Sequence, residues 1–304
     1  MIKMLDTIII GSGPAGLSAS IYIKRANLNV LVIEKDYEGT GQVVESGKVD
    51  NYLGIPEISG YELGEKFREH ALKAGVNFLE ANVINIKKQK DNILRVELEN
   101  GEYVKAKTII YAAGATHRRL NVLGEEKYLG RGVSYCAICD GAFYKNKVVA
   151  VIGGGDVALD DAVYLSEIAK KVYLIHRRKE FRGAESTLNL LKEKENVEIL
   201  IDSEVDSILG DDKVTSILLK NKREIILDGI FSAIGMTPKT EILKELIDLD
   251  EYGYVKADET GKTNLNGFFV AGDVRQKELR QIVTAVSDGA NAATSAINYI
   301  RDNI

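Results

Sequence analysis

The chain has 304 residues, carries 40 Lys and Arg against 45 Asp and Glu for a net charge of −5, and contains two cysteines, Cys136 and Cys139. At ~150 residues per domain, this length predicts about two domains. An acidic chain lacks the positive field of a nucleic-acid-binding protein. Two cysteines exclude a disulfide-stapled secreted scaffold and a four-cysteine zinc site. We therefore expect neither a nucleic-acid partner nor a metal.

No apolar stretch approaches the ~18 residues that a membrane span needs, so no membrane partner is expected. Only ten residues precede Gly11, where the first motif opens, which leaves no room for a signal peptide. We expect the protein in the cytoplasm. There a Cys-x-x-Cys pair is more often redox-active than structural.

The first motif is the dinucleotide-binding fingerprint. In chain order it comprises an apolar strand at 7–10, a turn containing Gly11, Gly13 and Gly16, a helix over 17–25, a second strand at 30–33, and Glu34. Gly11 permits the tight turn, Gly13 lets a pyrophosphate approach the backbone, and Gly16 lets the helix pack against the strand. The helix N-terminus then offers free N–H groups to the phosphates.

The same unit recurs 142 residues further along. Gly153, Gly155 and Ala158 take the places of Gly11, Gly13 and Gly16, between a strand at 148–152 and a helix over 159–168, with a further strand at 172–175. One such motif is weak evidence, but two in matched strand–helix–strand context predict two dinucleotide sites. Asp156, which follows Gly155, is assigned to the second site.

The residue after each second strand separates the two sites. Glu34 suits a ribose 2′-hydroxyl and repels a 2′-phosphate. Its counterpart His176 is followed by Arg177, Arg178 and, slightly later, Arg182, whose guanidinium groups suit a 2′-phosphate. We predict FAD at the first site and NADPH at the second, with a solvated basic loop as the alternative reading of the arginines.

The remaining segments predict the domain plan. Apolar strands ending in small residues at 108–114 and 268–273 flank the second unit, 230–235 is its exit strand, 80–107 reads as a β-hairpin or meander, and the final helix starts near Arg280. The simplest arrangement is an α/β chain of two Rossmann-like domains, the second inserted into the first. We expect an FAD-binding domain from 1–116 and 242–304, and an NADPH-binding domain from 117–241 that carries the Cys-x-x-Cys pair.

Cys136-Ala137-Ile138-Cys139-Asp140-Gly141, just upstream of the second glycine motif, resembles bacterial low-molecular-weight thioredoxin reductases. The likeness extends over essentially the whole chain, through the Gly41-Gln42 turn, Asn51, 176–182, 271–273 and Arg280-Gln281. Val157, Gly183 and Leu279 depart from it, standing where that family commonly has Ser, Ala and an aromatic residue.

The resemblance implies a role for each matching residue. Cys139 would face the flavin, Cys136 would attack the disulfide of the partner protein, and Asp140 would be the acid–base that protonates the leaving thiolate. The flavin set would be completed by Gln42, Asn51, Gly114, Asp273, Arg280 and Gln281. It further implies a homodimer whose partner is thioredoxin or a similar small Cys-x-x-Cys protein.

The residues themselves support this relay. A flavin accepts a hydride at one locus and passes electrons to sulfur at another, so two nucleotide sites and one dithiol suffice. A zinc half-site, inert thiols and a static disulfide are the alternatives for the cysteines. Asp140 could instead cap a helix or turn, and Gln42 and Asn51 could be ordinary turn residues. His176 could instead be a core residue. At the level of function, another Cys-x-x-Cys or peroxide-reducing partner, or a redox sensor without turnover, is the alternative.

Overall fold

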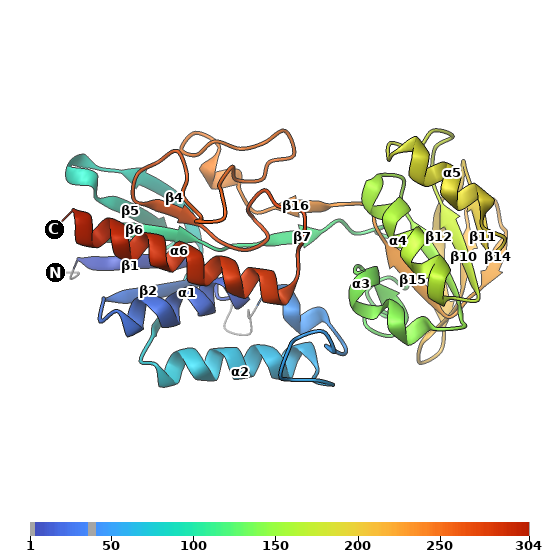
Figure 1. Cartoon of the computed structure of the whole chain (residues 1–304), viewed down its shortest axis with the longest axis horizontal. Coiled ribbons are helices and arrows are strands. Elements are labelled where there is room, and N and C mark those ends of the chain that lie inside the picture. The colour runs from blue at the N-terminus through green and yellow to red at the C-terminus, as the bar shows by residue number, and fades with distance from the viewer. Residues whose placement is uncertain (1–3, 36–40, 304) are drawn as a thin grey trace. The chain divides into compact units, whose positions relative to one another are not determined.

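The computed structural model describes residues 4–35 and 41–303 and divides the chain into two compact units (Figure 1). The first comprises Met1–Ser46, Tyr52–Thr116 and Thr237–Ile304; the second comprises Gly47–Asn51 and His117–Met236. The second crossing therefore falls at Met236/Thr237, earlier than the predicted boundary at 241/242. The reason is local: the Tyr111 hydroxyl donates to the Lys239 carbonyl, and buried Thr240 donates to the Gly253 carbonyl.

The first unit contains a seven-stranded sheet with strand order β3-β2-β1-β6-β5-β4, and β17 pairs with β6. Its elements are β1 (Leu5–Ile10), α1 (Pro14–Arg25), β2 (Val30–Glu34), η1 (Gly41–Glu45), α2 (Gly60–Lys73), β3 (Asn77–Glu80), β4 (Val83–Lys88), η2 (Lys90–Asn92), β5 (Leu94–Leu98), β6 (Tyr103–Tyr111), η4 (Glu241–Leu243), β17 (Phe268–Val270) and α6 (Ile282–Asp302). β1, β2, β3, β17 and the second half of β6 run parallel, whereas β4, β5 and the first half of β6 form the predicted meander.

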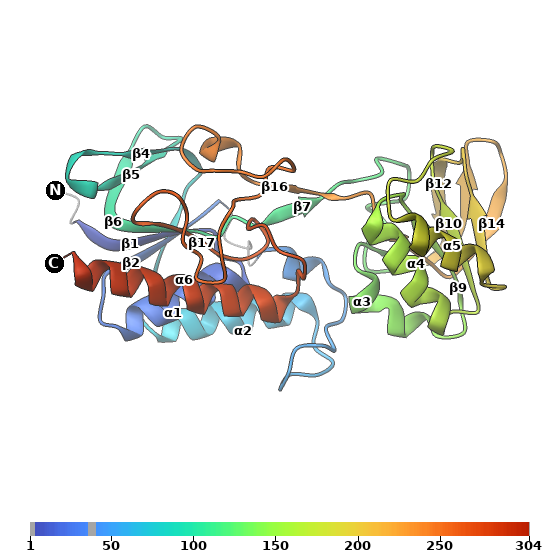
Figure 2. The same ribbon diagram turned by 45° about the horizontal axis from the view of Figure 1, so that its top comes forward.

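The helices α1, α2 and α6 gather on one face of this sheet (Figures 1 and 2). The side chains alternate along the strands as β-geometry requires: Ile9 and Ile110 join the core under the helices, whereas Ile8 and Ile109 point into the core on the opposite face. Because both faces are buried, the central strands are continuous apolar runs, which made them visible in the sequence.

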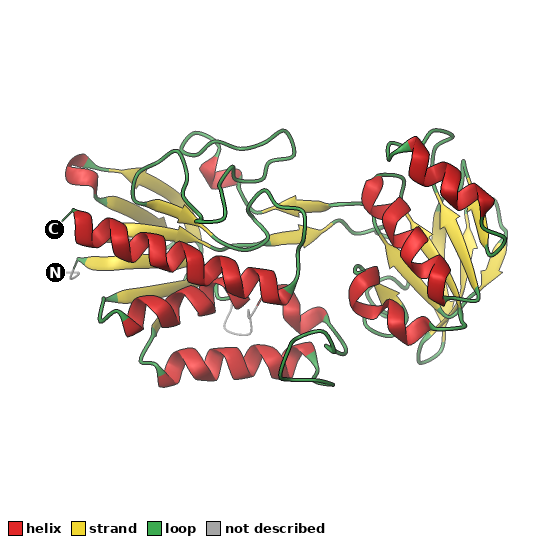
Figure 3. Cartoon of the chain, viewed as in Figure 1, coloured by secondary structure: helices red, strands yellow, loops and turns green. Residues whose placement is uncertain are grey.

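The second unit has a five-stranded parallel sheet of order β11-β10-β9-β15-β8 and an antiparallel ladder β12-β13-β14 (Figure 3). Its elements are β8 (Val133–Ser134), α3 (Ala137–Asp140), η3 (Gly141–Tyr144), β9 (Val148–Ile152), α4 (Asp156–Ile168), β10 (Lys171–Ile175), α5 (Glu185–Glu193), β11 (Val197–Leu200), β12 (Val205–Gly210), β13 (Val214–Leu219), β14 (Glu224–Ile226) and β15 (Gly229–Ser232). β7 (Ala115–His117) and β16 (Met236–Pro238) pair with each other.

Both glycine-led helices begin three residues earlier than predicted. α1 starts at Pro14 and α4 at Asp156, because Gly13 and Gly155 already have extended backbone and act as N-caps. Pro14 suits the first helical position, where its missing N–H costs no hydrogen bond. The final helix starts at Ile282, close to the predicted start near Arg280, and Gln281 is its N-cap.

Gly289→Ala is expected to destabilise the first unit by about 1–3 kcal/mol, as overpacking does. A Cβ at Gly289 in α6 would lie 2.1 Å from the backbone oxygen of Ala15 in α1, so the two helices must move apart. In an open helix the same change would stabilise by about 1 kcal/mol. Urea unfolding measured by circular dichroism decides the sign, with the exposed Ser287→Ala in the same helix as control.

Candidate functional site

The first glycine turn is shaped by backbone contacts that leave no room for side chains. Gly11 has φ +107°, and a Cβ there would lie 2.4 Å from the Ala112 carbonyl oxygen. A Cβ on Gly16 would lie 1.9 Å from the oxygen of Gly11. Gly13 caps α1 without a side-chain hydrogen bond, so the first N–H groups of α1 are available to an anion.

Glu34 lies where the sequence places it, at the end of β2, but it is already paired. Its two carboxylate oxygens accept from Arg68 Nη1 and Nη2 of α2 at 2.6 and 2.7 Å, and both side chains are buried. The Arg68 guanidinium lies 4.4 Å from the centre of the Phe78 ring. A carboxylate offers about four acceptor positions, so Glu34 can still accept from ribose hydroxyls while Arg68 fixes its orientation.

Asp273 presents an acceptor that the protein leaves unused. Its Oδ1 is buried and has no hydrogen-bond partner among the described residues, and burial raises the pKa of the carboxyl against the opposing effects of Lys277 and Arg280. An unpartnered buried oxygen is costly unless a ligand supplies a donor. The hydroxyl groups of a bound dinucleotide cofactor fit this requirement.

The other predicted flavin residues do not all fall in one unit. Gln42 lies in η1, Gly114 follows β6 with φ +70° and open space at its Cβ position, and Gln281 caps α6. The Arg280 guanidinium lies 4.2 Å from the centre of the Tyr254 ring. Asn51, by contrast, belongs to the Gly47–Asn51 segment that groups with the second unit.

The second glycine turn repeats the first with a different lining. A Cβ on Gly153 would lie 2.5 Å from the Ala233 oxygen, and one on Gly154 would lie 2.2 Å from the imidazole of His176. Gly155, in contrast, has no atom of the described residues within 4 Å of its Cβ position. The turn is therefore tightly packed behind Gly153 and Gly154 and open at Gly155, where α4 begins. This opening is where a pyrophosphate would meet the helix N-terminus.

His176 packs its ring directly against the glycine turn at Gly154. It is buried, its Nε2 lies 3.0 Å from the Glu180 carbonyl oxygen, and its ring lies 4.8 Å from that of Phe181. Burial, followed by the charges of Arg182, Arg177 and Arg178, lowers the pKa of His176. A neutral imidazole packed on Gly154 supports the core role that the sequence left open.

The basic loop folds back onto the glycine turn. The Arg182 and Gly183 amides donate to the Gly154 carbonyl, and the Ala184 amide donates to the Asp156 carboxylate. A Cβ on Gly183 would lie 2.6 Å from Leu159 Cδ1 and 2.9 Å from the Asp156 backbone nitrogen, so a side chain here would force the loop to shift.

The arginines of this loop are exposed. Within the described residues, the guanidinium groups of Arg177, Arg178 and Arg182 form no ion pair. Together with the open space at Gly155, they are able to hold a phosphorylated dinucleotide.

Cys136 and Cys139 form a disulfide at the start of α3, with Cα atoms 5.3 Å apart. The Cys139 amide donates to Cys136 Sγ at 3.2 Å, and Ser134 Oγ accepts the Cys136 amide. Beside them, burial raises the pKa of Asp140, partly opposed by a hydrogen bond with Ser134. The site thus combines a disulfide with a carboxyl that holds its proton more tightly than usual.

The residues that hold Tyr135, which directly precedes Cys136, were not predicted from the sequence. The His117 and Tyr135 rings stack 4.8 Å apart, Arg119 donates to the tyrosine hydroxyl, and that hydroxyl donates to buried Glu125. Burial lowers the pKa of His117 to about 4, so its ring is neutral at neutral pH. The aromatic residue beside Cys136 is visible in the sequence, but nothing there indicates that it stacks on a histidine 18 residues earlier.

Neither a metal cluster nor a membrane span is found within residues 4–35 and 41–303. No group of three or more His, Cys, Asp or Glu side chains there is placed to hold a metal ion. The helices of the same ranges are each too short or too polar to cross a bilayer.

Residues 5–289 match the family described as pyridine nucleotide-disulphide oxidoreductase. The chain therefore belongs to this family of oxidoreductases, and its predicted α/β fold with two Rossmann-like domains is confirmed.

Relatives and solved structures of similar length match almost end to end. The thioredoxin reductase of Helicobacter pylori is 42% identical and is covered to 99%, with 98% of this chain matched. A 34.2 kDa protein in the rubredoxin operon of Clostridium pasteurianum is also 42% identical, with 98% of each chain covered. The crystal structure of thioredoxin reductase from Streptococcus pyogenes, 40% identical, matches 99% of this chain and 100% of its own with a TM-score of 0.94.

Asp140→Asn is expected to raise stability more at pH 7 than at pH 4. In the unfolded chain this carboxyl ionises near its ordinary value of 3.8, whereas burial raises its pKa in the folded state. The folded wild type therefore loses stability as the pH rises from about 4 to the raised pKa, and asparagine does not titrate. At pH 4 the two proteins should agree within about 0.5 kcal/mol.

Urea midpoints at the two pH values measure this difference, with the exposed Asp206→Asn of the same unit as control. A constant difference between the two proteins across this range would contradict the burial of the Asp140 carboxylate.

Proposed function

We propose that this protein is an NADPH-dependent thioredoxin-disulfide reductase, with FAD in the first unit and NADPH in the second. The observation that carries the proposal is the Cys136–Cys139 disulfide, formed by the chain's only two thiols beside Asp140, within a unit that also holds a dinucleotide turn. When bound, the flavin supplies the conversion of a hydride into the two electrons that open this disulfide.

The cofactor assignment rests on the different polar groups that follow the second strand of each unit, a paired carboxylate in the first and exposed guanidinium groups in the second. In the first unit, Glu34 with its Arg68 partner and the unpartnered Oδ1 of Asp273 support FAD. In the second, the exposed Arg177, Arg178 and Arg182 beside the open Gly155 support NADPH, because guanidinium groups bind a 2′-phosphate with charge-assisted hydrogen bonds. The proposed FAD site also includes Gly11, Gly13, Gly16, Gln42, Asn51, Gly114, Arg280 and Gln281. The proposed NADPH site also includes Gly153, Asp156 and His176.

The chain's own groups can perform the sulfur chemistry in a balanced sequence. After reduction, the Cys136 thiolate attacks one sulfur of the partner's disulfide, forming a mixed disulfide and releasing a thiolate that takes the proton of Asp140. The Cys139 thiol then gives its proton to the Asp140 carboxylate and attacks Cys136 Sγ, which breaks the mixed disulfide and forms the internal one. The partner's second sulfur leaves as a thiolate and takes that proton from Asp140. The partner leaves as a dithiol.

The hydrogen bond from the Cys139 amide to Cys136 Sγ supports Cys136 as the attacking thiol. The same donor would stabilise negative charge on that sulfur once the disulfide opens, which lowers the pKa of a thiol. The raised pKa of Asp140 suits a proton donor, because its proton is held to higher pH than in an ordinary carboxyl.

The experiment that tests this function is a reductase assay of freshly purified protein. The expected result is a yellow protein that oxidises NADPH when oxidised thioredoxin is added. Other Cys-x-x-Cys proteins and the disulfide arm of a peroxide reductase are assayed in parallel, because the Clostridium relative has a name that specifies no partner. Turnover with one of these alone would move the proposal to that partner. Absence of flavin and of all turnover would reject the enzyme and favour a redox sensor.

Replacing Arg177 and Arg178 together by alanine is expected to raise the KM for NADPH at least roughly tenfold, since charged hydrogen bonds contribute about 1.5–3 kcal/mol each. The KM for NADH should change little, because NADH has no 2′-phosphate. Steady-state kinetics with both nucleotides measures the difference, and Lys192→Ala, an exposed cation of α5, is the control. Equal effects on the two nucleotides would contradict the assignment.

The cysteine roles are tested by trapping. A thioredoxin variant that keeps only its attacking cysteine, activated with thionitrobenzoate, should form a stable mixed disulfide with the Cys139→Ser protein, whose remaining thiol is Cys136. The Cys136→Ser protein should react at least about tenfold more slowly, because its thiol lacks the amide hydrogen bond. Released thionitrobenzoate and a non-reducing gel report both reactions. Equal rates would remove the distinction between the two cysteines, and a faster reaction of the Cys136→Ser protein would reverse it.

A further inference from the structure

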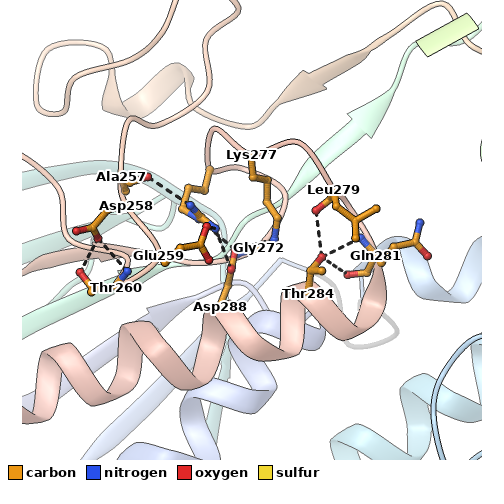
Figure 4. A network of polar contacts seen from close by, with 11 residues as sticks. Ala257, Asp258, Glu259, Thr260, Gly272, Lys277, Leu279, Gln281, Thr284 and Asp288 are labelled. Carbon is orange, nitrogen blue, oxygen red and sulfur yellow. Dashed lines mark hydrogen bonds and ion pairs between the residues drawn. The ribbon is translucent and has the colours of Figure 1, made fainter. Parts of the chain in front are cut away.

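Asp288 lies within α6, is 4% exposed, and has no part in the proposed electron transfer. Its carboxylate accepts from the Gly272 amide at 3.0 Å, from Arg275 Nε and Nη2 at 3.3 and 3.1 Å, and from Lys277 Nζ at 3.0 Å (Figure 4). One buried side chain therefore holds three residues of the 272–277 turn, which also contains Asp273.

This turn lies against the first turn of α1. Gly272 has φ +78°, and a Cβ there would lie 2.9 Å from the Cβ of Ala15. Gly289, next to Asp288, packs on the same residue from α6. The turn is thus fixed between the helix whose N-terminus suits phosphates and the helix that carries Asp288, on the side where the cofactor is proposed to bind.

Two buried cations of this cluster share one buried carboxylate. Arg275 and Lys277 are 4% and 7% exposed and share the single buried carboxylate of Asp288; the other partner of Arg275, Glu259, is 81% exposed. Asp273 lies close enough to feel the charges of Lys277 and Arg280, although burial has the larger effect and raises its pKa. If Asp288 lost its charge, Asp273 would be a buried carboxyl on which the charge of Lys277 already acts.

We propose that Asp288 is a positioning residue for the flavin cofactor. It holds the 272–277 turn in place and keeps the cations of that turn away from Asp273, which leaves Asp273 Oδ1 available to the cofactor's hydroxyl groups. This inference rests on the proposed binding of FAD in the first unit.

The test is the rate at which FAD leaves the holoenzyme after dilution, followed by the recovery of flavin fluorescence. Asp288→Asn keeps the size of the side chain and removes its charge. We expect FAD to leave at least roughly tenfold faster, a difference of about 1.4 kcal/mol. Adding Lys277→Met removes the cation left without its carboxylate, so the double variant should release FAD within about threefold of wild type.

Glu259→Gln is the matched control, because it removes the exposed carboxylate that contacts the same arginine and should leave the rate unchanged. Wild-type release from Asp288→Asn would overturn the inference. So would release from the double variant as fast as from Asp288→Asn, because a merely structural role predicts that the two changes add. If Asp288→Asn fails to fold, the double variant alone is compared with wild type, and FAD release more than about threefold faster than wild type would overturn the inference. A wild-type protein that binds no FAD would overturn the cofactor assignment as well, and this outcome is visible before any variant is made.

Discussion

Both halves of the chain depend on glycines whose Cβ positions are already occupied by backbone or ring atoms. Gly11 approaches the oxygen of Ala112 so closely that α1 can start directly after β1, and its counterpart Gly153 approaches the oxygen of Ala233 in the same way ahead of α4. This packing places a helix N-terminus at the carboxyl edge of a parallel sheet in each unit. The proposed phosphate binding depends on that placement, because the first N–H groups of a helix have no partner within the helix.

On this shared frame, the difference between the two sites comes from charge. The buried Glu34–Arg68 pair gives the first site an oriented acceptor with little net charge, whereas three exposed arginines give the second a positive rim. Burial determines which charged groups are paired within the protein and which are exposed and able to bind a ligand. A buried pair must be satisfied within the protein, whereas exposed guanidinium groups can bind a phosphate at little desolvation cost.

The disulfide shows how a short segment acquires chemistry from its surroundings. Ser134 holds the Cys136 amide, the Cys139 amide reaches Cys136 Sγ, and burial raises the pKa of Asp140. In an unfolded chain the cysteine thiols and the Asp140 carboxyl would behave like any other thiol or carboxyl. The stack of His117 on Tyr135 adds rigidity to the residue just before the disulfide.

The fold class, the two glycine turns and the cysteine pair could be predicted from the amino-acid sequence, because they depend on apolar runs and on spacing within about thirty residues. The sequence also placed the basic loop. It missed Arg68, Asp288, Glu125 and the segment between 236 and 242, because their roles arise from contacts between residues far apart in the chain. The folded structure was needed to show that Arg68 of α2 fixes Glu34, that His176 is buried behind the glycine turn, and that one oxygen of Asp273 has no hydrogen-bond partner among the described residues. Such contacts leave no periodic signal in the sequence, since they are created when the sheet brings distant segments to one edge.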